Sequence, residues 1–349
     1  AEHRGKVPGI VHDQSSTGQT IFIEPQVIVN LNNELRELEL AEKVEIERIL
    51  AELSSNVAEH FHDIMNNQKL LITLDVIFAK AKFSLLVHGE EPEIAEEGEL
   101  VLKQARHPLI ESKKVVPINI NVGGHYKTLV VTGPNTGGKT VTLKTTGLLV
   151  LMAQSGLHIP ALSTSRIPVF HQVFADIGDE QSIEQSLSTF SSHMRNIVEI
   201  LDNVDNKSLV LVDELGAGTD PTEGAALAIS ILNFLKNMGA RCMATTHYSE
   251  LKTYAMNTEG VTNAFCEFDV ETLKPTFKLT VGAPGKSNAF AISQKLGLSE
   301  KVLKSAESYV ASDNKQMEKV LGELEAERQK AEKEREKAEA MRKEFEEFK

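Results

Sequence analysis

Apolar side chains recur at helical spacing through residues 31–86, and charged residues fill many of the positions between them. The apolar positions are Leu31, Leu35, Leu38, Ile46, Ile49, Leu53, Phe61, Ile64, Leu71, Leu74, Phe78 and Leu85. A helical region this long predicts a lever or an antiparallel helical hairpin rather than a globular core. A plain amphipathic bundle fits the pattern equally well, so both alternatives stay open. We call residues 31–86 the helical arm.

Two short runs with strand character precede the helical arm. Residues 6–12 and 20–24 are rich in apolar and β-branched side chains, and the polar, glycine-containing segment 13–18 between them has turn chemistry. Pro25 ends the second run. Residues 1–29 are therefore predicted to form a β-hairpin.

A break rich in Gly, Glu and Pro at residues 89–98 separates the helical arm from a region with a different pattern. Short apolar runs then alternate with helical segments. Strands are predicted at residues 99–102, 117–122, 128–132, 169–176, 209–212, 241–245, 265–269 and 275–281, and helices at residues 141–155, 190–201 and 222–237. This alternation predicts an α/β domain whose central sheet is mostly parallel and covered by helices.

A final helix is predicted from Ser299 to the end of the chain, with heptad spacing from Met317. One seam position holds Met317, Leu324, Ala331, Ala338 and Phe345, and the other holds Val320, Glu327, Glu334, Met341 and Phe348. A coiled coil and a solvated single helix both fit this pattern. The predicted organisation is a hairpin at 1–29, a helical lever or clamp region at 30–98, an α/β domain at 99–298 and a helix at 299–349.

Composition limits the cellular compartment and the kinds of partner that we expect for the protein. The 349 residues include only two cysteines, which form neither a disulfide framework nor a zinc cluster, so a reducing cytoplasm is expected. No apolar run is long enough for a membrane span, and no membrane partner is expected. A net charge of −13 argues against a chain that wraps a polyanion over its whole surface, but a local nucleic-acid contact stays possible. Since the chain starts at Ala1 and ends within a helical pattern, we expect a fragment of a longer protein.

A glycine-rich loop between a predicted strand and a predicted helix carries the clearest chemical signal. Its residues are Gly133, Pro134, Asn135, Thr136, Gly137, Gly138, Lys139 and Thr140. Glycines let successive N–H groups turn toward a phosphate, and the helix start adds positive potential. In such a P-loop, Lys139 reaches the β- and γ-phosphates of ATP and the Thr140 hydroxyl binds Mg²⁺.

Two further strand ends carry polar residues. Asp213 and Glu214 follow the apolar strand 209–212, so they are expected at the ligand edge of a parallel sheet. Asp213 is predicted to hold Mg²⁺ through water, and Glu214 to act as the general base for the attacking water. His247 follows the next strand and is predicted to donate a hydrogen bond to the γ-phosphate.

Two loops allow more than one interpretation. Residues 216–221 follow the acidic pair and fit either a simple strand-to-helix loop or a loop presented to a second subunit. Residues 186–193 are rich in hydroxyl groups before a helix, which suits a phosphate and suits N-capping equally.

Together these segments resemble the ABC-type ATPase module of the MutS family. The P-loop at 133–140 has the residue pattern of that family's P-loop. Residues 105–109 resemble its entry motif, and residues 246–247 resemble its histidine switch. The acidic pair and the loop after it resemble its Walker B motif and D-loop. Residues 188–190 resemble its signature segment, which implies that Ser188 contacts ATP in the partner subunit. Residues 282–287 also resemble a family segment, although their spacing excludes a second P-loop.

Residues 9–18 and 176–182 are similar to the bacterial type-two branch of the family. The resemblance implies a homodimeric ATPase that uses ATP and Mg²⁺ and acts on collided ribosomes, through rRNA, or on branched DNA. It also implies that the parent protein carries a C-terminal nuclease domain outside these residues. Alternatives are a long-coiled-coil repair ATPase, which the uninterrupted nucleotide motifs disfavour, an ATP-binding scaffold with slow turnover, and a DNA-only binding module.

Overall fold

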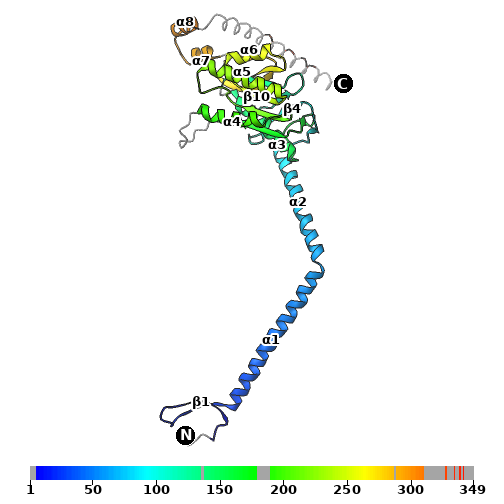
Figure 1. Cartoon of the computed structure of the whole chain (residues 1–349), viewed down its shortest axis with the longest axis vertical. Coiled ribbons are helices and arrows are strands. Elements are labelled where there is room, and N and C mark those ends of the chain that lie inside the picture. The colour runs from blue at the N-terminus through cyan, green and yellow to red at the C-terminus, as the bar shows by residue number, and fades with distance from the viewer. Residues whose placement is uncertain are drawn as a thin grey trace. The chain divides into compact units, whose positions relative to one another are not determined.

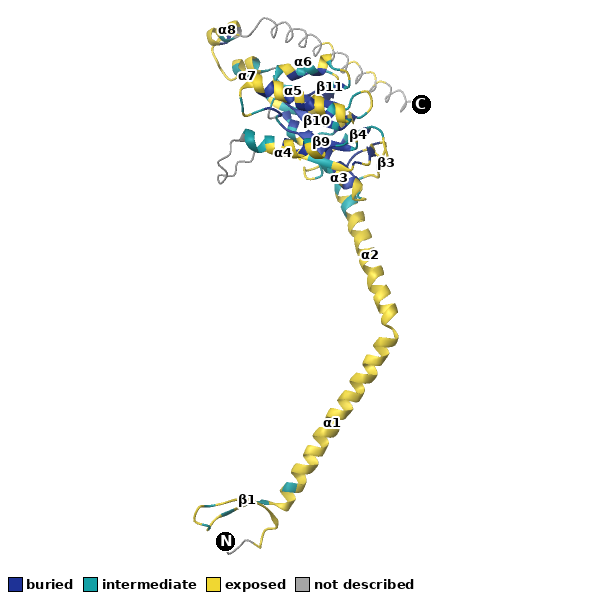
Figure 2. Cartoon of the chain, in the orientation of Figure 1, coloured by how far each residue is buried: buried dark blue, intermediate teal, exposed yellow. Residues whose placement is uncertain are grey.

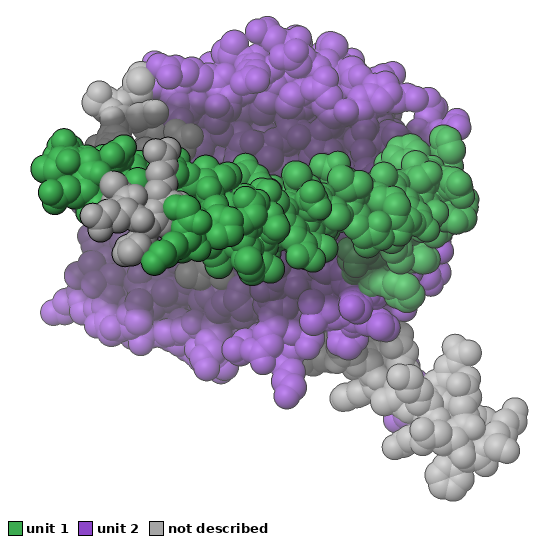
Figure 3. All heavy atoms as spheres, turned by 90° about the horizontal axis from the view of Figure 1, so that it is seen from below, with its two compact units in different colours: residues 1–79 green, residues 80–349 purple. Residues whose placement is uncertain are grey.

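The structure is a computed structural model, and it describes residues 5–134, 137–178, 189–286 and 288–309 together with the single positions 327, 334, 338 and 341. The chain divides into two compact units, residues 1–79 and 80–349, which Figure 3 colours separately. Each unit is described here by itself.

The first unit contains the predicted hairpin and most of the helical arm (Figure 1). Strands β1 (Gly9–Gln14) and β2 (Ile21–Pro25) pair antiparallel, which confirms the hairpin. Helix α1 (Gln26–Glu59) follows directly, and α2 (Phe61–Val87) begins after His60. A break at His60 was not predicted, and a single intervening residue is too short for the loop of an antiparallel hairpin. Neither helix has a buried residue, so the described chain forms no bundle around them (Figure 2).

The second unit is built on a six-stranded sheet of order β12-β11-β6-β10-β9-β8. The strands are β6 (Thr128–Thr132), β8 (Gln172–Asp176), β9 (Ser208–Val212), β10 (Arg241–Thr245), β11 (Val261–Asp269) and β12 (Lys274–Val281). All neighbouring pairs are parallel except β11 with β12, which confirms the mostly parallel α/β sheet.

A smaller sheet of order β3-β7-β4-β5 packs in the same unit. Its strands are β3 (Glu93–Ala95), β4 (Leu100–Ala105), β5 (Ile118–Val122) and β7 (Arg166–Pro168). The short β3 and β7 were not predicted, because three residues are too few to establish an alternating pattern. They pair in parallel with each other across 73 residues of chain, from Glu93 to Arg166.

Six helices belong wholly to the second unit within the described ranges: α3 (Lys139–Gln154), α4 (Thr189–Asn203), α5 (Pro221–Met238), α6 (Ser249–Asn257), α7 (Ala289–Lys295) and α8 (Glu300–Tyr309). Helix α6 was not predicted. The expected final helix begins as α8 after Ser299, and its heptad positions lie outside the described residues apart from four single sites, so the coiled coil stays a prediction. Within the described ranges, none of the helices combines enough length with enough apolar character for a bilayer crossing.

The two faces of the main sheet bury separate cores because successive strand residues point in opposite directions. Leu129 and Val131 of β6 join a core that includes Leu143 of α3. Val130 points to the other face, into a core that includes Leu232 of α5. With both faces covered, the polar groups at the two ends of the strands mark the edges at which this sheet meets solvent or ligand.

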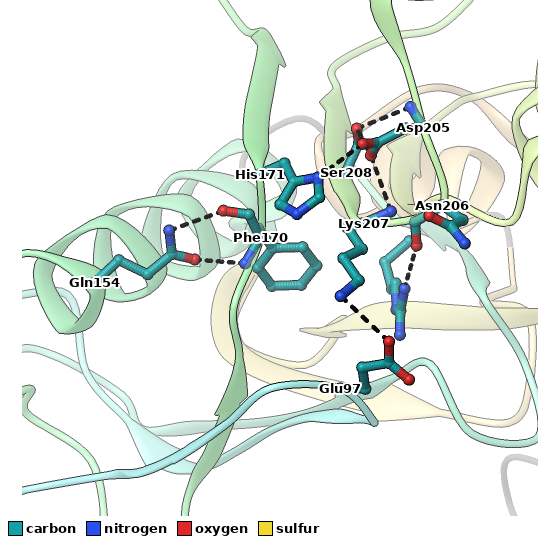
Figure 4. A network of polar contacts seen from close by, with 9 residues as sticks. Glu97, Gln154, Phe170, His171, Asp205, Asn206, Lys207 and Ser208 are labelled. Atoms are coloured by element: carbon teal, nitrogen blue, oxygen red, sulfur yellow. Dashed lines mark hydrogen bonds and ion pairs between the residues drawn. The ribbon is translucent and has the colours of Figure 1, made fainter.

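At the amino ends of these strands a polar network joins several connecting segments (Figure 4). The Asp205 carboxylate accepts a hydrogen bond of 2.7 Å from the Ser208 hydroxyl and lies 2.9 Å from Nδ1 of His171. Lys207 forms an ion pair of 3.2 Å with Glu97. Arg241, the first residue of β10, donates to the carbonyl of Gly98 at 3.0 Å. These contacts fix the segment before β4 to the edge opposite the P-loop.

Candidate nucleotide-binding site

Three neighbouring parallel strands end at the same edge of the main sheet. β6 leads into the P-loop, β9 leads into Asp213 and Glu214, and β10, which lies between them, leads toward His247. The strand order therefore brings the P-loop, the acidic pair and the His247 segment to one edge, as the sequence predicted. Because each strand is parallel to its neighbour, all three sets of side chains lie at the carboxyl edge, where α/β sheets bind ligands.

The P-loop and the acidic strand are joined by a direct contact. The Thr140 hydroxyl donates a hydrogen bond of 2.6 Å to Oδ2 of Asp213, whose side chain is largely buried. Hydroxyl and carboxylate oxygens are hard ligands of the kind that Mg²⁺ prefers. Within the described ranges, no group of three or more His, Cys, Asp or Glu side chains is arranged to hold a metal alone. The pair suits a Mg²⁺ ion whose other ligands are phosphate oxygens and water.

Lys139 begins α3 and is almost wholly buried, with 2% of its surface exposed. Its Nζ donates a hydrogen bond of 2.8 Å to the Gly133 carbonyl and lies 3.1 Å from Nε2 of His247. Burial lowers the pKa of the Lys139 ammonium, and the nearby carboxylates of Glu214 and Asp213 oppose that shift. The charge of a bound triphosphate would favour the charged form of this buried ammonium.

His247 lies between the lysine and the second acid. Its Nε2 is 3.5 Å from Oε1 of Glu214, and both side chains are nearly half exposed. Burial, followed by the charge of Lys139, lowers the pKa of the imidazole, and Glu214 opposes the shift. The neutral ring that results retains one N–H donor, as a hydrogen bond to a phosphate requires.

The backbone at Glu214 adopts the left-handed conformation, with φ = 48°. A glutamate rarely takes this conformation, and such strain is concentrated at functional sites. Its side chain has 41% of its surface exposed, so the carboxylate is accessible to water.

Two glycines of the P-loop have positive φ, 133° at Gly133 and 97° at Gly138. A side chain at Gly138 would place its Cβ 3.0 Å from the Phe277 ring, and one at Gly133 would lie 3.0 Å from the Cys266 carbonyl. Both positions therefore require glycine for conformation and for space. The predicted Asn135 and Thr136 lie outside the described residues.

An apolar pocket beside the P-loop was not predicted from the sequence. It has a volume of about 210 Å³, and its lining includes Val115, Val116, Val141, Gly138 and Phe277. The only sequence signal near it was the resemblance of residues 105–109 to an entry motif. The pocket draws on a loop, a helix and an edge strand far apart in the chain, a combination that periodicity does not detect.

The loop after the acidic pair has a structural explanation in this chain. The Asp220 carboxylate caps α5 by accepting hydrogen bonds of 2.9 Å and 3.1 Å from the N–H groups of Thr222 and Glu223. Gly216, with φ = 85°, lies so close to Gly224 that a Cβ would be 2.4 Å from its carbonyl oxygen. A role toward a second subunit stays a prediction. Ser188, predicted to act in trans, lies outside the described residues.

The second glycine-containing segment, described over residues 282–286, packs against the P-loop strand. The N–H of Gly285 donates a hydrogen bond of 3.1 Å to the Thr132 hydroxyl at the end of β6. A Cβ on Gly285 would approach the Phe265 side chain to 2.7 Å. This segment thus packs under the P-loop. It does not form a second phosphate-binding loop, which its glycine spacing had already excluded.

Comparison with known proteins agrees with this geometry. The MutS domain V family matches residues 129–313. The chain is 60% identical over 330 residues to endonuclease MutS2 of Alkaliphilus oremlandii, which covers 95% of the chain and 42% of that protein. It is 58% identical over 349 residues to endonuclease MutS2 of Clostridioides difficile, covering 100% of the chain and 44% of that protein. The chain thus spans less than half the length of these relatives. It belongs to the MutS family, and within that family to the type-two branch.

Proposed function

We propose that this chain binds and hydrolyses ATP at the carboxyl edge of the main sheet, as the ATPase part of a homodimeric clamp. The observation that carries the proposal is the placement of Lys139, Thr140, Asp213, Glu214 and His247 around one edge, linked by contacts of 2.6 Å to 3.5 Å. Each of these groups has the chemistry that phosphoryl transfer to water requires.

In this scheme Lys139 binds the β- and γ-phosphates, and Thr140 and Asp213 hold Mg²⁺. The ion, when bound, neutralises charge on the phosphate oxygens. Glu214 orients the attacking water and accepts its proton as the bond to the γ-phosphorus forms and the bond to the leaving ADP oxygen breaks. His247 donates a hydrogen bond to the γ-phosphate and distinguishes its presence from its loss.

The apolar pocket beside Gly138 suits the adenine base. Phe277 lies on β12, which is on the other side of β6 from β9, so a base in this pocket would lie away from the acidic pair. Phe277 would supply an aromatic face for stacking. Base stacking of this kind contributes about 1–3 kcal/mol.

The clamp includes two features that we propose by family resemblance. Ser188 of each subunit contacts the nucleotide of the other, so ATP closes the dimer, and closure moves the helical arm at residues 31–86. The clamp grips either a collided ribosome, through rRNA, or branched DNA, in the cytoplasm. The relatives are named endonucleases, and we assign any such activity of the whole protein to parts beyond this chain.

The test uses the full-length protein with Glu214→Gln, which removes the base and keeps the side chain's size. This variant should retain ATP, fail to cleave it, and form dimers with ATP at micromolar concentration. Sedimentation through a density gradient with ATP, with collided ribosomes and a branched DNA offered together, identifies the ligand. Lys139→Ala is the matched control, because it should remain in the unbound fractions.

Migration with ribosomes would support a ribosome-splitting ATPase, and preference for branched DNA would support control of recombination. Rapid ATP cleavage by Glu214→Gln would contradict the role given to Glu214. A variant that stays monomeric with ATP would contradict the clamp. Wild-type protein that holds ATP without significant turnover would favour a scaffold.

A further inference from the structure

Thr245, the last residue of β10, lies between the two acids of the neighbouring strand and is fully buried. Its hydroxyl donates a hydrogen bond to Oδ1 of Asp213, and the same hydroxyl oxygen accepts a hydrogen bond of 2.8 Å from the backbone N–H of Glu214. One hydroxyl group therefore contacts both residues of the acidic pair.

The backbone of Thr245 extends this attachment. Its carbonyl oxygen accepts a hydrogen bond of 3.0 Å from the N–H of Leu215. Three consecutive residues, Asp213, Glu214 and Leu215, are thus held by one residue of the adjacent strand. Regular pairing of β9 with β10 ends at Val212 opposite Ala244, so the contacts of Thr245 begin where the ladder stops.

These contacts help to fix the backbone conformation of Glu214 and the orientation of the Asp213 carboxylate. The left-handed backbone at Glu214 costs conformational energy, and the hydrogen bond from its N–H to Thr245 is one of the contacts that hold it. The Asp213 carboxylate has one oxygen bound to Thr245 and the other bound to Thr140. With Oδ1 held, Oδ2 faces the P-loop, on the side where a metal ion would bind.

A buried threonine at a strand end could be present only for packing. The chain offers a comparison at Thr128, the first residue of β6, which is also fully buried. The Thr128 hydroxyl has no hydrogen-bond partner within the described ranges. Packing alone accounts for Thr128. It does not account for the Thr245 hydroxyl, which bonds both the Asp213 carboxylate and the Glu214 N–H.

We propose that Thr245 is a positioning residue for ATP hydrolysis: its hydroxyl fixes the Asp213 carboxylate toward Mg²⁺ and the Glu214 backbone in the conformation that aims the base at water. The inference rests on the proposed ATPase function. Displacement of a catalytic group by about 1 Å is enough to lower a rate by about 100-fold.

The experiment compares Thr245→Val, which keeps the shape and removes the hydroxyl, with Thr245→Ser, which restores it. Thr128→Val is the control for removing a buried threonine hydroxyl. For each full-length protein, kcat, the Kd for ATP, the Mg²⁺ concentration for half-maximal activity and the melting temperature are measured.

We expect Thr245→Val to lower kcat by about 10- to 100-fold with a Kd for ATP within about threefold of the wild type. Its half-maximal Mg²⁺ concentration should rise, Thr245→Ser should recover most of the rate, and Thr128→Val should behave as the wild type.

An unchanged kcat in Thr245→Val would overturn the proposal. So would equal losses in kcat and in stability that serine does not rescue, because these would indicate packing alone. A wild-type protein without ATP turnover would instead refute the proposed ATPase function, so the two failures are distinguishable.

Discussion

The hydroxyl of Thr140 and the carboxylate of Asp213 lie 2.6 Å apart although the two residues are 73 positions apart in the chain. One belongs to the helix that follows the P-loop, and the other follows a strand two positions away in the sheet. Their contact means that the fold itself brings together the two side chains that we propose to hold Mg²⁺. Predictions about this site therefore concern the loss of single groups rather than the collapse of its framework.

Lys139→Ala should abolish nucleotide binding, with a rise in the Kd for ATP of about 100-fold or more, because a buried ammonium supplies charge-assisted hydrogen bonds to phosphates. Because burial lowers the pKa of this group, its charge adds little to stability, so the variant should stay folded despite the loss of the hydrogen bond to the Gly133 carbonyl. Titration with a fluorescent ATP analogue and a thermal melt check both expectations. Lys127→Ala, just before β6 at the end of that strand away from the P-loop, is the control and should bind normally. Tight binding by Lys139→Ala would exclude the P-loop assignment.

Phe277→Ala should weaken ATP binding by about 5- to 160-fold if the apolar pocket holds the base, because it removes a stacking surface worth about 1–3 kcal/mol. Competition by inorganic triphosphate, which has no base, should be unaffected. Phe277→Tyr keeps the ring and should retain most of the affinity. An equal loss for ATP and triphosphate would place the base elsewhere.

The two cysteine thiols should be inert in the folded protein. Burial raises the pKa of Cys242 to about 12 and that of Cys266 to about 11. At pH 8 the thiolate of Cys266 is then about one part in a thousand, and the thiolate is the reactive form. A thiol-reactive disulfide reagent should label neither residue in native protein at pH 8 and both in guanidinium. Stoichiometric labelling within minutes under native conditions would contradict the buried placement of both.

Asp205→Asn should lower the melting temperature at pH 7 by about 2–4 °C, the change expected for a loss near 1 kcal/mol. The Ser208 hydroxyl is the main cause of a lowered pKa at Asp205, and the contact with His171 adds to it. A carboxylate with a lowered folded pKa contributes stability above its unfolded pKa of about 3.9, and that contribution is lost as pH falls through the folded value.

The difference in melting temperature between wild type and Asp205→Asn should therefore shrink as the pH is lowered from 7 toward and below 4. Melts across this range check the expectation, with Asp202→Asn on the exposed end of α4 as the control. A difference that stays constant with pH would mean that the charge of Asp205 plays no part in stabilising the network.

The sequence predicted the main sheet well because its buried strands are continuous apolar runs, such as residues 209–212, next to recognisable turn chemistry. The positions of Lys139, Asp213 and His247 followed from the rule that parallel strands present their carboxyl ends together. The kink at His60 could not be predicted, because no Pro or Gly marks it. Phe277 was missed because its contact with Gly138 depends on tertiary packing.

Thr245 illustrates a different limit. Its place at a strand end was evident, but a β-branched residue is expected in a strand for reasons of shape alone. Its hydrogen bonds to Asp213 and Glu214 depend on the register of β10 with β9, which periodicity does not specify. A sequence shows which strand ends come together, whereas the register decides which hydroxyl meets which carboxylate.

Helix α3 starts at Lys139 in the P-loop, and the residue that ends it, Ser155, accepts a hydrogen bond of 3.2 Å from Lys80 on α2. Deleting or inserting one residue in α3 would turn its far end by about 100° and shift it by about 1.5 Å. Such a change would separate Ser155 from Lys80 even if every residue of the proposed ATP site were kept. Over evolutionary time the length of α3 should therefore vary less than its exposed side chains do, because insertions and deletions there are selected against independently of the residues they add or remove.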